Sequence, residues 1–76
     1  MSRHQLDARR LLCPMPVIRT QNMINTLKAG DILEVTCTDP GALHDIPTWC
    51  RINGHKVVTS SADGDEIIIT IEVDDG

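Results

Sequence analysis

A cysteine followed by two alternating prolines is the feature of this sequence with the clearest chemical potential, Cys13-Pro14-Met15-Pro16. Proline suits the first turn of a helix because its ring fixes φ and its missing N–H would be unpaired there. The motif therefore predicts that Cys13 caps a helix, beside the positive end of the helix dipole and free backbone N–H groups. Such a setting favours the thiolate, the form of cysteine that attacks electrophilic sulfur or carbon.

Cys13 has no catalytic base beside it in the sequence. A cysteine hydrolase needs a base within hydrogen-bond reach, and the three histidines, at positions 4, 44 and 55, are all distant from Cys13 in the sequence. A thiol that only exchanges with another thiol needs no base of its own. Its rate of thiol exchange depends on thiolate fraction, nucleophilicity and access.

The other two cysteines fall in patterns typical of a protein core. Cys37 alternates with Leu33 and Val35 as in a strand, and Cys50 lies on the apolar face of a predicted helix. An odd number of cysteines without a C-x-x-C pair favours reduced thiols over a disulfide framework. Cys50 and His55 supply fewer ligands than a zinc site needs, so no metal is expected.

Apolar spacing predicts the element order βαβαββ. Intervals of three and four predict helices at residues 14–28 and 42–52, and alternation predicts strands at 5–8, 31–38, 55–60 and 66–73. We expect Leu43, Ile46 and Cys50 on the buried face of the second helix, and Pro47 to disturb that helix. The order predicts an α+β two-layer sandwich, with two helices on one face of a four-stranded mixed sheet.

Length and charge limit the classes of function. The 76 residues predict a single domain over residues 1–76, with an ordered core of about 5–73 and too little mass for a large enclosed cavity. A net charge of −4 argues against a general nucleic-acid binder. No stretch is apolar enough to span a membrane, and the N-terminal residues lack the apolar core of a signal peptide, so a cytoplasmic location is expected.

Four short segments carry a family resemblance: LDA at residues 6–8, LLCPMPV at 11–17, TDP at 38–40 and DIP at 45–47. Together they resemble the TusA/SirA family of sulfur-carrier (sulfurtransferase) proteins over most of the chain. The resemblance implies that Cys13 accepts sulfane sulfur as a persulfide from a cysteine desulfurase or a rhodanese-like donor. Cys13 would then pass the sulfur to a cysteine of an acceptor protein.

The resemblance also implies where such a relay would act. In relatives, these relays feed 2-thiolation of tRNA wobble uridine, or sulfur trafficking and oxidation, and the residues here do not choose between them. The expected protein is a monomer that works with partner enzymes rather than a stand-alone enzyme. It needs no cofactor beyond the covalent persulfide, and it has no need to contact nucleic acid or a membrane.

Several residues around the cysteine have supporting roles in this interpretation. Pro14 and Pro16 are expected to hold the first helical turn rigid, and Met15 to give an exposed apolar contact. A second set is expected to dock partners or to tune the thiolate: Arg9, Arg10, Arg19 and Asp39. For Asp39, capping of the helix that follows is an equally direct interpretation.

Arg10 departs from the family pattern, which commonly has glycine three residues before the cysteine. Glycine at such a place indicates a positive φ or a close backbone approach, and arginine makes a positive φ costly. We therefore expect the turn at Arg10 to differ from that of relatives. Alternatively, Arg9 and Arg10 place two positive charges near Cys13, which would favour the thiolate and dock an acidic partner.

Two other classes of function remain open. A thiol-based redox or regulatory interaction module would use oxidation of Cys13 to change a partner contact, without a transferable persulfide. An RNA-binding domain can share the same element order, because fold does not imply function. The net negative charge and the single aromatic residue count against recognition of RNA by stacking.

Overall fold

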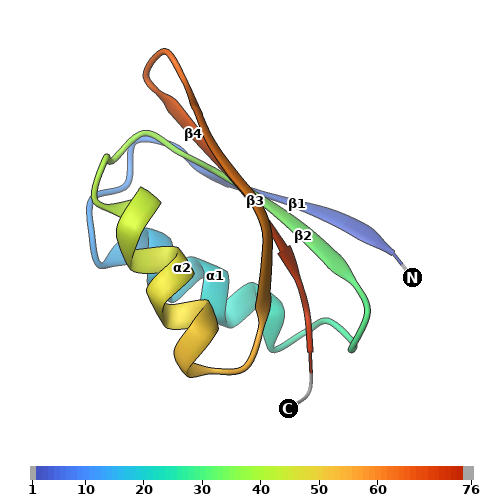
Figure 1. The fold of residues 1–76 in the computed structure, drawn as a ribbon. Coiled ribbons are helices and arrows are strands. Elements are labelled where there is room, and N and C mark those ends of the chain that lie inside the picture. Colours follow the sequence, from blue (N-terminus) through green and yellow to red (C-terminus); the bar gives the residue numbers. More distant parts are fainter. Residues whose placement is uncertain (1, 75–76) are drawn as a thin grey trace.

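The computed structural model describes residues 2–74, and its elements follow the predicted order βαβαββ. The strands are β1 (Arg3–Ala8), β2 (Ile32–Cys37), β3 (Lys56–Asp63) and β4 (Glu66–Glu72), and the helices are α1 (Met15–Ile24) and α2 (Ala42–Ile52). Both helices lie on the same face of the sheet (Figure 1). The two-layer fold predicted from the sequence is therefore confirmed. No helix within residues 2–74 is long and apolar enough to cross a membrane.

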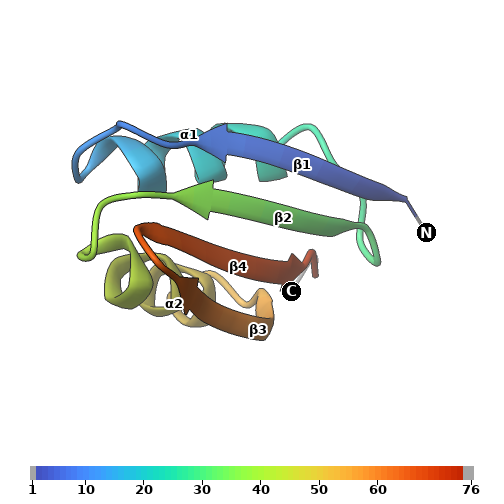
Figure 2. The same cartoon turned by 90° about the horizontal axis from the view of Figure 1, so that it is seen from above.

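The four strands form one mixed sheet in the order β1-β2-β4-β3. β1 runs parallel to β2, with Ala8 opposite Cys37, and the other two pairings are antiparallel. Because β1 and β2 are parallel neighbours, their carboxyl ends lie at the same edge of the sheet. Both helices begin beyond that edge, as Figure 2 shows from above.

The core lies between the sheet and the helices and is built from aliphatic side chains. Alternate residues of the two central strands are buried, among them Leu33 and Val35 of β2 and Ile69 and Ile71 of β4, each with no exposed surface. The period of two places one side of each strand against the helices. With no Phe or Tyr in the sequence, isoleucine, leucine and valine fill this layer.

The first helix is shorter than the pattern of residues 14–28 predicted. It ends at Ile24, because the chain then tightens into turns: Thr26 N–H donates to Met23 O at 3.0 Å, and Leu27 N–H to Ile24 O at 2.9 Å. These bonds span three residues instead of the four of an α-helix. Leu27 still packs against the core from the turn. The apolar spacing therefore continued beyond the helix itself.

The second helix runs unbroken through Pro47, contrary to the expected disturbance. Proline removes one backbone donor, and the helix keeps bonds nearby: Asp45 N–H donates to Gly41 O at 2.9 Å, and Thr48 Oγ1 donates to His44 O at 2.9 Å. The prediction that Leu43 is buried was also wrong, since 39% of it is exposed.

Ile46 and Cys50 face the core as predicted, and Ala42 takes the place expected for Leu43 in this row. These positions are four residues apart and lie one above the other on a helix. The last hairpin also differs slightly, because β3 extends to Asp63 instead of residue 60. Only Gly64 and Asp65 remain as its turn, and the φ of 60° at Gly64 suits glycine.

Candidate functional site

Two loops meet at the carboxyl edge of β1 and β2 and hold Cys13 between them. One connects β1 to α1 and the other connects β2 to α2, and they lie side by side in both views (Figures 1 and 2). Two hydrogen bonds join them: Arg10 N–H donates to Thr38 Oγ1 at 2.8 Å, and Cys13 N–H donates to Asp39 Oδ2 at 2.7 Å. The backbone of Cys13 is therefore fixed by the Asp39 carboxylate.

Arg10 adopts the left-handed backbone conformation, with φ of 68°. Arginine therefore does not keep the backbone out of the positive-φ region, costly though that region is for a residue with a Cβ. The backbone keeps the conformation that glycine would take most easily, and its N–H is held by Thr38. A residue with a Cβ is strained in this region of φ, so the contacts between the loops must impose the conformation.

Cys13 lies one residue before the helix cap, not at it. Pro14 is the cap, Met15 is the first helical residue, and Pro16 is buried in the first turn. The peptide bond between Cys13 and Pro14 is cis. Met15 N–H donates to Leu12 O at 2.8 Å, so this amide is not available to the sulfur. The predicted cap position for Cys13 was therefore wrong by one residue.

Gly41 marks the point where the thiol and two carboxylates converge. A methyl group added to Gly41 would lie 3.4 Å from Cys13 Sγ, 3.4 Å from Asp39 Oδ1 and 3.8 Å from Asp45 Oδ2. Asp39 Oδ1 also accepts the Gly41 N–H at 3.0 Å. Asp39 comes from the loop after β2, and Asp45 from the first turn of α2. The tertiary fold therefore places two acidic side chains beside the candidate nucleophile.

The surroundings of Cys13 favour its neutral thiol. The pKa of Cys13 is raised to about 12, and burial is the largest cause. The hydrogen bonds and the negative charges of the Asp39 and Asp45 carboxylates raise it further. Two negative groups disfavour a third negative charge beside them. These surroundings oppose the thiolate that the sequence pattern around Cys13 was expected to favour. The backbone N–H groups of Cys13 and Gly41 in turn lower the pKa of Asp39.

The arginines that were expected to tune the thiolate lie in other surroundings. Arg9 Nε binds Asp7 Oδ1 at 2.9 Å, and Arg9 Nη1 binds Glu66 Oε2 at 3.3 Å. Arg10 lines a surface pocket with the same acidic residues. Neither side chain is among the groups that shift the pKa of Cys13. Arg19 is exposed on α1. The structure thus brings Asp39, but neither Arg9 nor Arg10, into the charge environment of the sulfur.

The remaining cysteines are core residues, as their patterns predicted. Cys37 and Cys50 have no exposed surface, whereas Cys13 is partly exposed.

His55 stacks on Trp49 with ring centroids 5.5 Å apart, and its Nδ1 accepts the Asp74 N–H at 3.1 Å. Within residues 2–74, no group of three or more potential ligands is placed to hold a metal ion.

Sequence reasoning missed Asp45 and Gly41 as members of the site. They lie far from Cys13 in the sequence, and their proximity to it depends on the parallel pairing of β1 with β2. The local signals were the repeated acidic residue, at positions 39 and 45, around the start of a predicted helix, and the place of Asp45 in the DIP segment of the family resemblance. The repeated acidic residue indicates a helix N-terminus, and neither signal indicates a neighbouring cysteine.

An apolar groove between the two helices includes Pro14, the residue that follows Cys13. Its volume is about 310 Å³, and its lining includes Pro14, Val17, Trp49 and Ile52. Ile52, in this lining, is 77% exposed, and Leu12, next to Cys13 in the sequence, is 74% exposed. Exposed apolar side chains around a reactive group are typical of a surface that contacts another protein.

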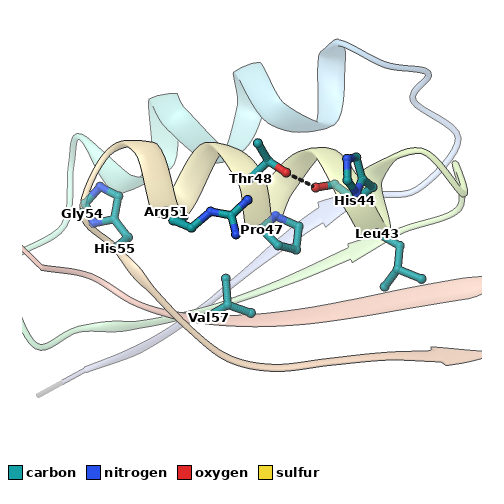
Figure 3. Close-up of a pocket in the computed structure, with 8 residues that line it drawn as sticks. All are labelled: Leu43, His44, Pro47, Thr48, Arg51, Gly54, His55 and Val57. Atoms are coloured by element: carbon teal, nitrogen blue, oxygen red, sulfur yellow. Dashed lines mark hydrogen bonds between the residues drawn. The ribbon is translucent and has the colours of Figure 1, made fainter.

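A larger groove, of about 630 Å³, lies on the other side of α2 against β3 (Figure 3). Figure 3 shows Pro47 and Arg51 on the helix above Val57 of β3, with His44 toward one end of the helix and His55 beyond the other. No cysteine lines this groove. The smaller groove also has no cysteine in its lining, and Pro14 and Asp45 are its links to the surroundings of Cys13.

Comparison with known proteins gives consistent matches over nearly the whole chain. Residues 4–73 match the family described as sulfurtransferase TusA. YrkI of Bacillus subtilis is 45% identical over 60 residues, which is 79% of this chain and 80% of that protein. Sulfur carrier protein TusA of Pseudomonas syringae is 41% identical over 59 residues, 78% of this chain and 70% of that protein.

A solved structure gives the same fold. The SirA-like protein of Desulfitobacterium hafniense has a TM-score of 0.82 and covers 93% of this chain and 97% of its own. The two sequences are 23% identical, so this likeness is evidence for the fold alone.

Proposed function

The chain belongs to the TusA family of sulfur carriers, and we propose on this premise that Cys13 carries the sulfur as a covalent persulfide. The observation that carries the proposal is the accessibility of the three thiols. Cys13 is partly exposed where two loops meet, whereas Cys37 and Cys50 are enclosed in the core. A carrier must present its sulfur to two different proteins in turn, and only an accessible thiol can do so.

The chemistry requires no cofactor beyond the persulfide itself. The Cys13 thiolate attacks the outer sulfur of a donor persulfide, and the S–S bond of the donor breaks with its electron pair leaving on the inner sulfur. The products are a persulfide on Cys13 and a thiol on the donor, without net oxidation or reduction. A thiolate of the acceptor then attacks the outer sulfur on Cys13 and restores the free thiol.

A sulfur carrier interacts with proteins that give and take sulfur. We propose a cysteine desulfurase or a rhodanese-like protein as donor, and a protein with a reactive cysteine as acceptor, in the cytoplasm. The delivered sulfur would serve tRNA 2-thiouridine formation or sulfur trafficking and oxidation. Met15, 37% exposed, and the apolar groove beside Pro14 support docking of such proteins at this edge. Arg10 and Arg19 are exposed and are proposed as further docking contacts.

Intact-mass spectrometry tests the loading step. The protein is incubated with a cysteine desulfurase and cysteine, and in parallel with a rhodanese and thiosulfate. We expect a gain of one sulfur atom that is lost on reduction, absent in Cys13→Ser and retained in Cys37→Ser and Cys50→Ser. Failure of loading with both donors would contradict the carrier role of Cys13 and favour a redox module, whose mark is a sulfenic acid or a mixed disulfide.

A further inference from the structure

The Cys13 thiol of the free protein lies in surroundings that oppose its own reaction. Its sulfur and the carboxylate oxygens of Asp39 and Asp45 converge on Gly41, and the pKa of Cys13 is raised to about 12. At neutral pH such a thiol is almost entirely protonated. Since the thiolate is the attacking species, the carboxylates beside Cys13 oppose sulfur exchange in the isolated protein.

We propose that Asp39 and Asp45 make the reactivity of Cys13 depend on its partner, which brings a lysine or arginine side chain to these carboxylates beside its own reactive sulfur. This inference rests on the proposed carrier role of Cys13. A cation between the two carboxylates neutralises the charge that opposes the thiolate. The same contact orients the sulfur of the partner toward Sγ. The carboxylates thereby act as positioning residues that select for a basic partner surface.

The transfer step balances with the carboxylates unchanged. The proton leaves Cys13 Sγ as the cation docks, and the thiolate forms a bond to the outer sulfur of the donor persulfide. The S–S bond of the donor breaks, and its inner sulfur leaves as a thiolate that takes up one proton. One S–S bond forms and one breaks, so no external oxidant or reductant is required.

No basic side chain of the described residues already fills this role. The charged groups that shift the pKa of Cys13 are Asp39, from the loop after β2, and Asp45, from α2. On the β1–α1 loop, Arg9 is held by Asp7 and Glu66. Arg10 lines a pocket with those acidic residues. The compensating positive charge must therefore come from another molecule.

Three small disulfides of different charge test the inference without a natural partner. Cystamine is cationic, bis(2-hydroxyethyl) disulfide is neutral, and dithiodiglycolate is anionic. We expect mixed disulfide to form on Cys13 fastest with cystamine and slowest with dithiodiglycolate, after correction for the reactivity of each reagent with free cysteine. A cation within a few ångströms of two carboxylates gives at least about a threefold preference that salt reduces. Equal corrected rates, or a faster anionic reagent, would overturn the proposal.

The variant Asp45→Asn locates the effect. The substitution removes one negative charge at an exposed position. It leaves in place the hydrogen bond that Cys13 N–H donates to Asp39. We expect the preference for cystamine to shrink and the pH midpoint of Cys13 alkylation by iodoacetamide to fall by about one unit, which is about a tenfold faster reaction at neutral pH. The matched control is Glu72→Gln. Glu72 lies on β4 opposite Ile32, the first residue of β2, whereas the Cys13 site lies beyond the last residue of β2. This variant should leave both readouts unchanged.

These readouts separate the inference from the carrier role. If Asp45→Asn matches Glu72→Gln in both readouts, the carboxylate effect is absent even where persulfide loading succeeds. If the charge preference holds but neither sulfur donor loads Cys13, the carrier role fails and the effect of the carboxylates on the thiol stands.

Discussion

Arg10→Gly is expected to stabilise the protein, because Arg10 holds a φ of 68° that carries strain for any residue with a Cβ. The left-handed conformation costs a non-glycine residue about 1–2 kcal/mol. Glycine removes that cost but adds freedom to the unfolded chain, which offsets about 0.5–1 kcal/mol. The hydrogen bond from the backbone N–H of residue 10 to Thr38 Oγ1 is kept. The expected net gain is about 0.5–1 kcal/mol.

Arg10→Ala is the matched control for this prediction. Alanine removes the guanidinium group but keeps the Cβ, so the backbone strain stays and no gain is expected. Urea unfolding followed by the fluorescence of Trp49, the single tryptophan, gives the free energy of unfolding. In a domain of this size a gain of about 1 kcal/mol raises Tm by about 4–8 °C. A midpoint for Arg10→Gly equal to or below that of Arg10→Ala would refute the reasoning.

Three further predictions concern stability. The pKa of Asp7 is lowered to about 2, and the pKa values of Asp31 and Asp39 are also lowered. The contribution of these carboxylates to folding stability is full above their ordinary pKa of 3.8 and is lost as the pH falls toward 2. Urea midpoints should therefore drop over that range, and a flat profile would contradict this. Ile69→Val in the core should cost about 1 kcal/mol by urea unfolding, and a loss well below that would indicate a loosely packed layer. Asp39→Asn should lower the urea midpoint more than Asp45→Asn, because only Asp39 accepts the N–H groups of both Cys13 and Gly41; the reverse order would contradict the assigned contacts.

The fold was predictable from the sequence because each strand and helix carries its own local pattern. The alternation of Ile67, Ile69 and Ile71 identifies the buried face of β4 without any tertiary information. Boundaries were less well predicted where apolar spacing and hydrogen bonding disagree, as at Leu27, which packs on the core from a turn after α1. The burial of Cys37 and Cys50 followed from the same periodicities and was confirmed.

The electrostatics of the site were not predictable, because they depend on residues that are adjacent only in the fold. A local view of Cys13 includes the prolines, the start of a helix and two arginines, and all of these suggest a thiolate. The fold instead turns Arg9 toward Asp7 and Glu66 and brings Asp45 to the sulfur. No pattern in the sequence contains the register that makes these contacts.

Onward delivery of sulfur from Cys13 is the most direct test of the central claim. The protein is loaded by a cysteine desulfurase with cysteine that contains radioactive sulfur, separated from the donor, and mixed with a candidate acceptor protein that has a reactive cysteine. We predict that the label leaves the wild-type protein and appears on the acceptor as reducible sulfur, and that Cys13→Ser never acquires it. Label that is delivered equally well by Cys13→Ser, or that enters Cys13 but never leaves it for any acceptor thiol, would contradict the account.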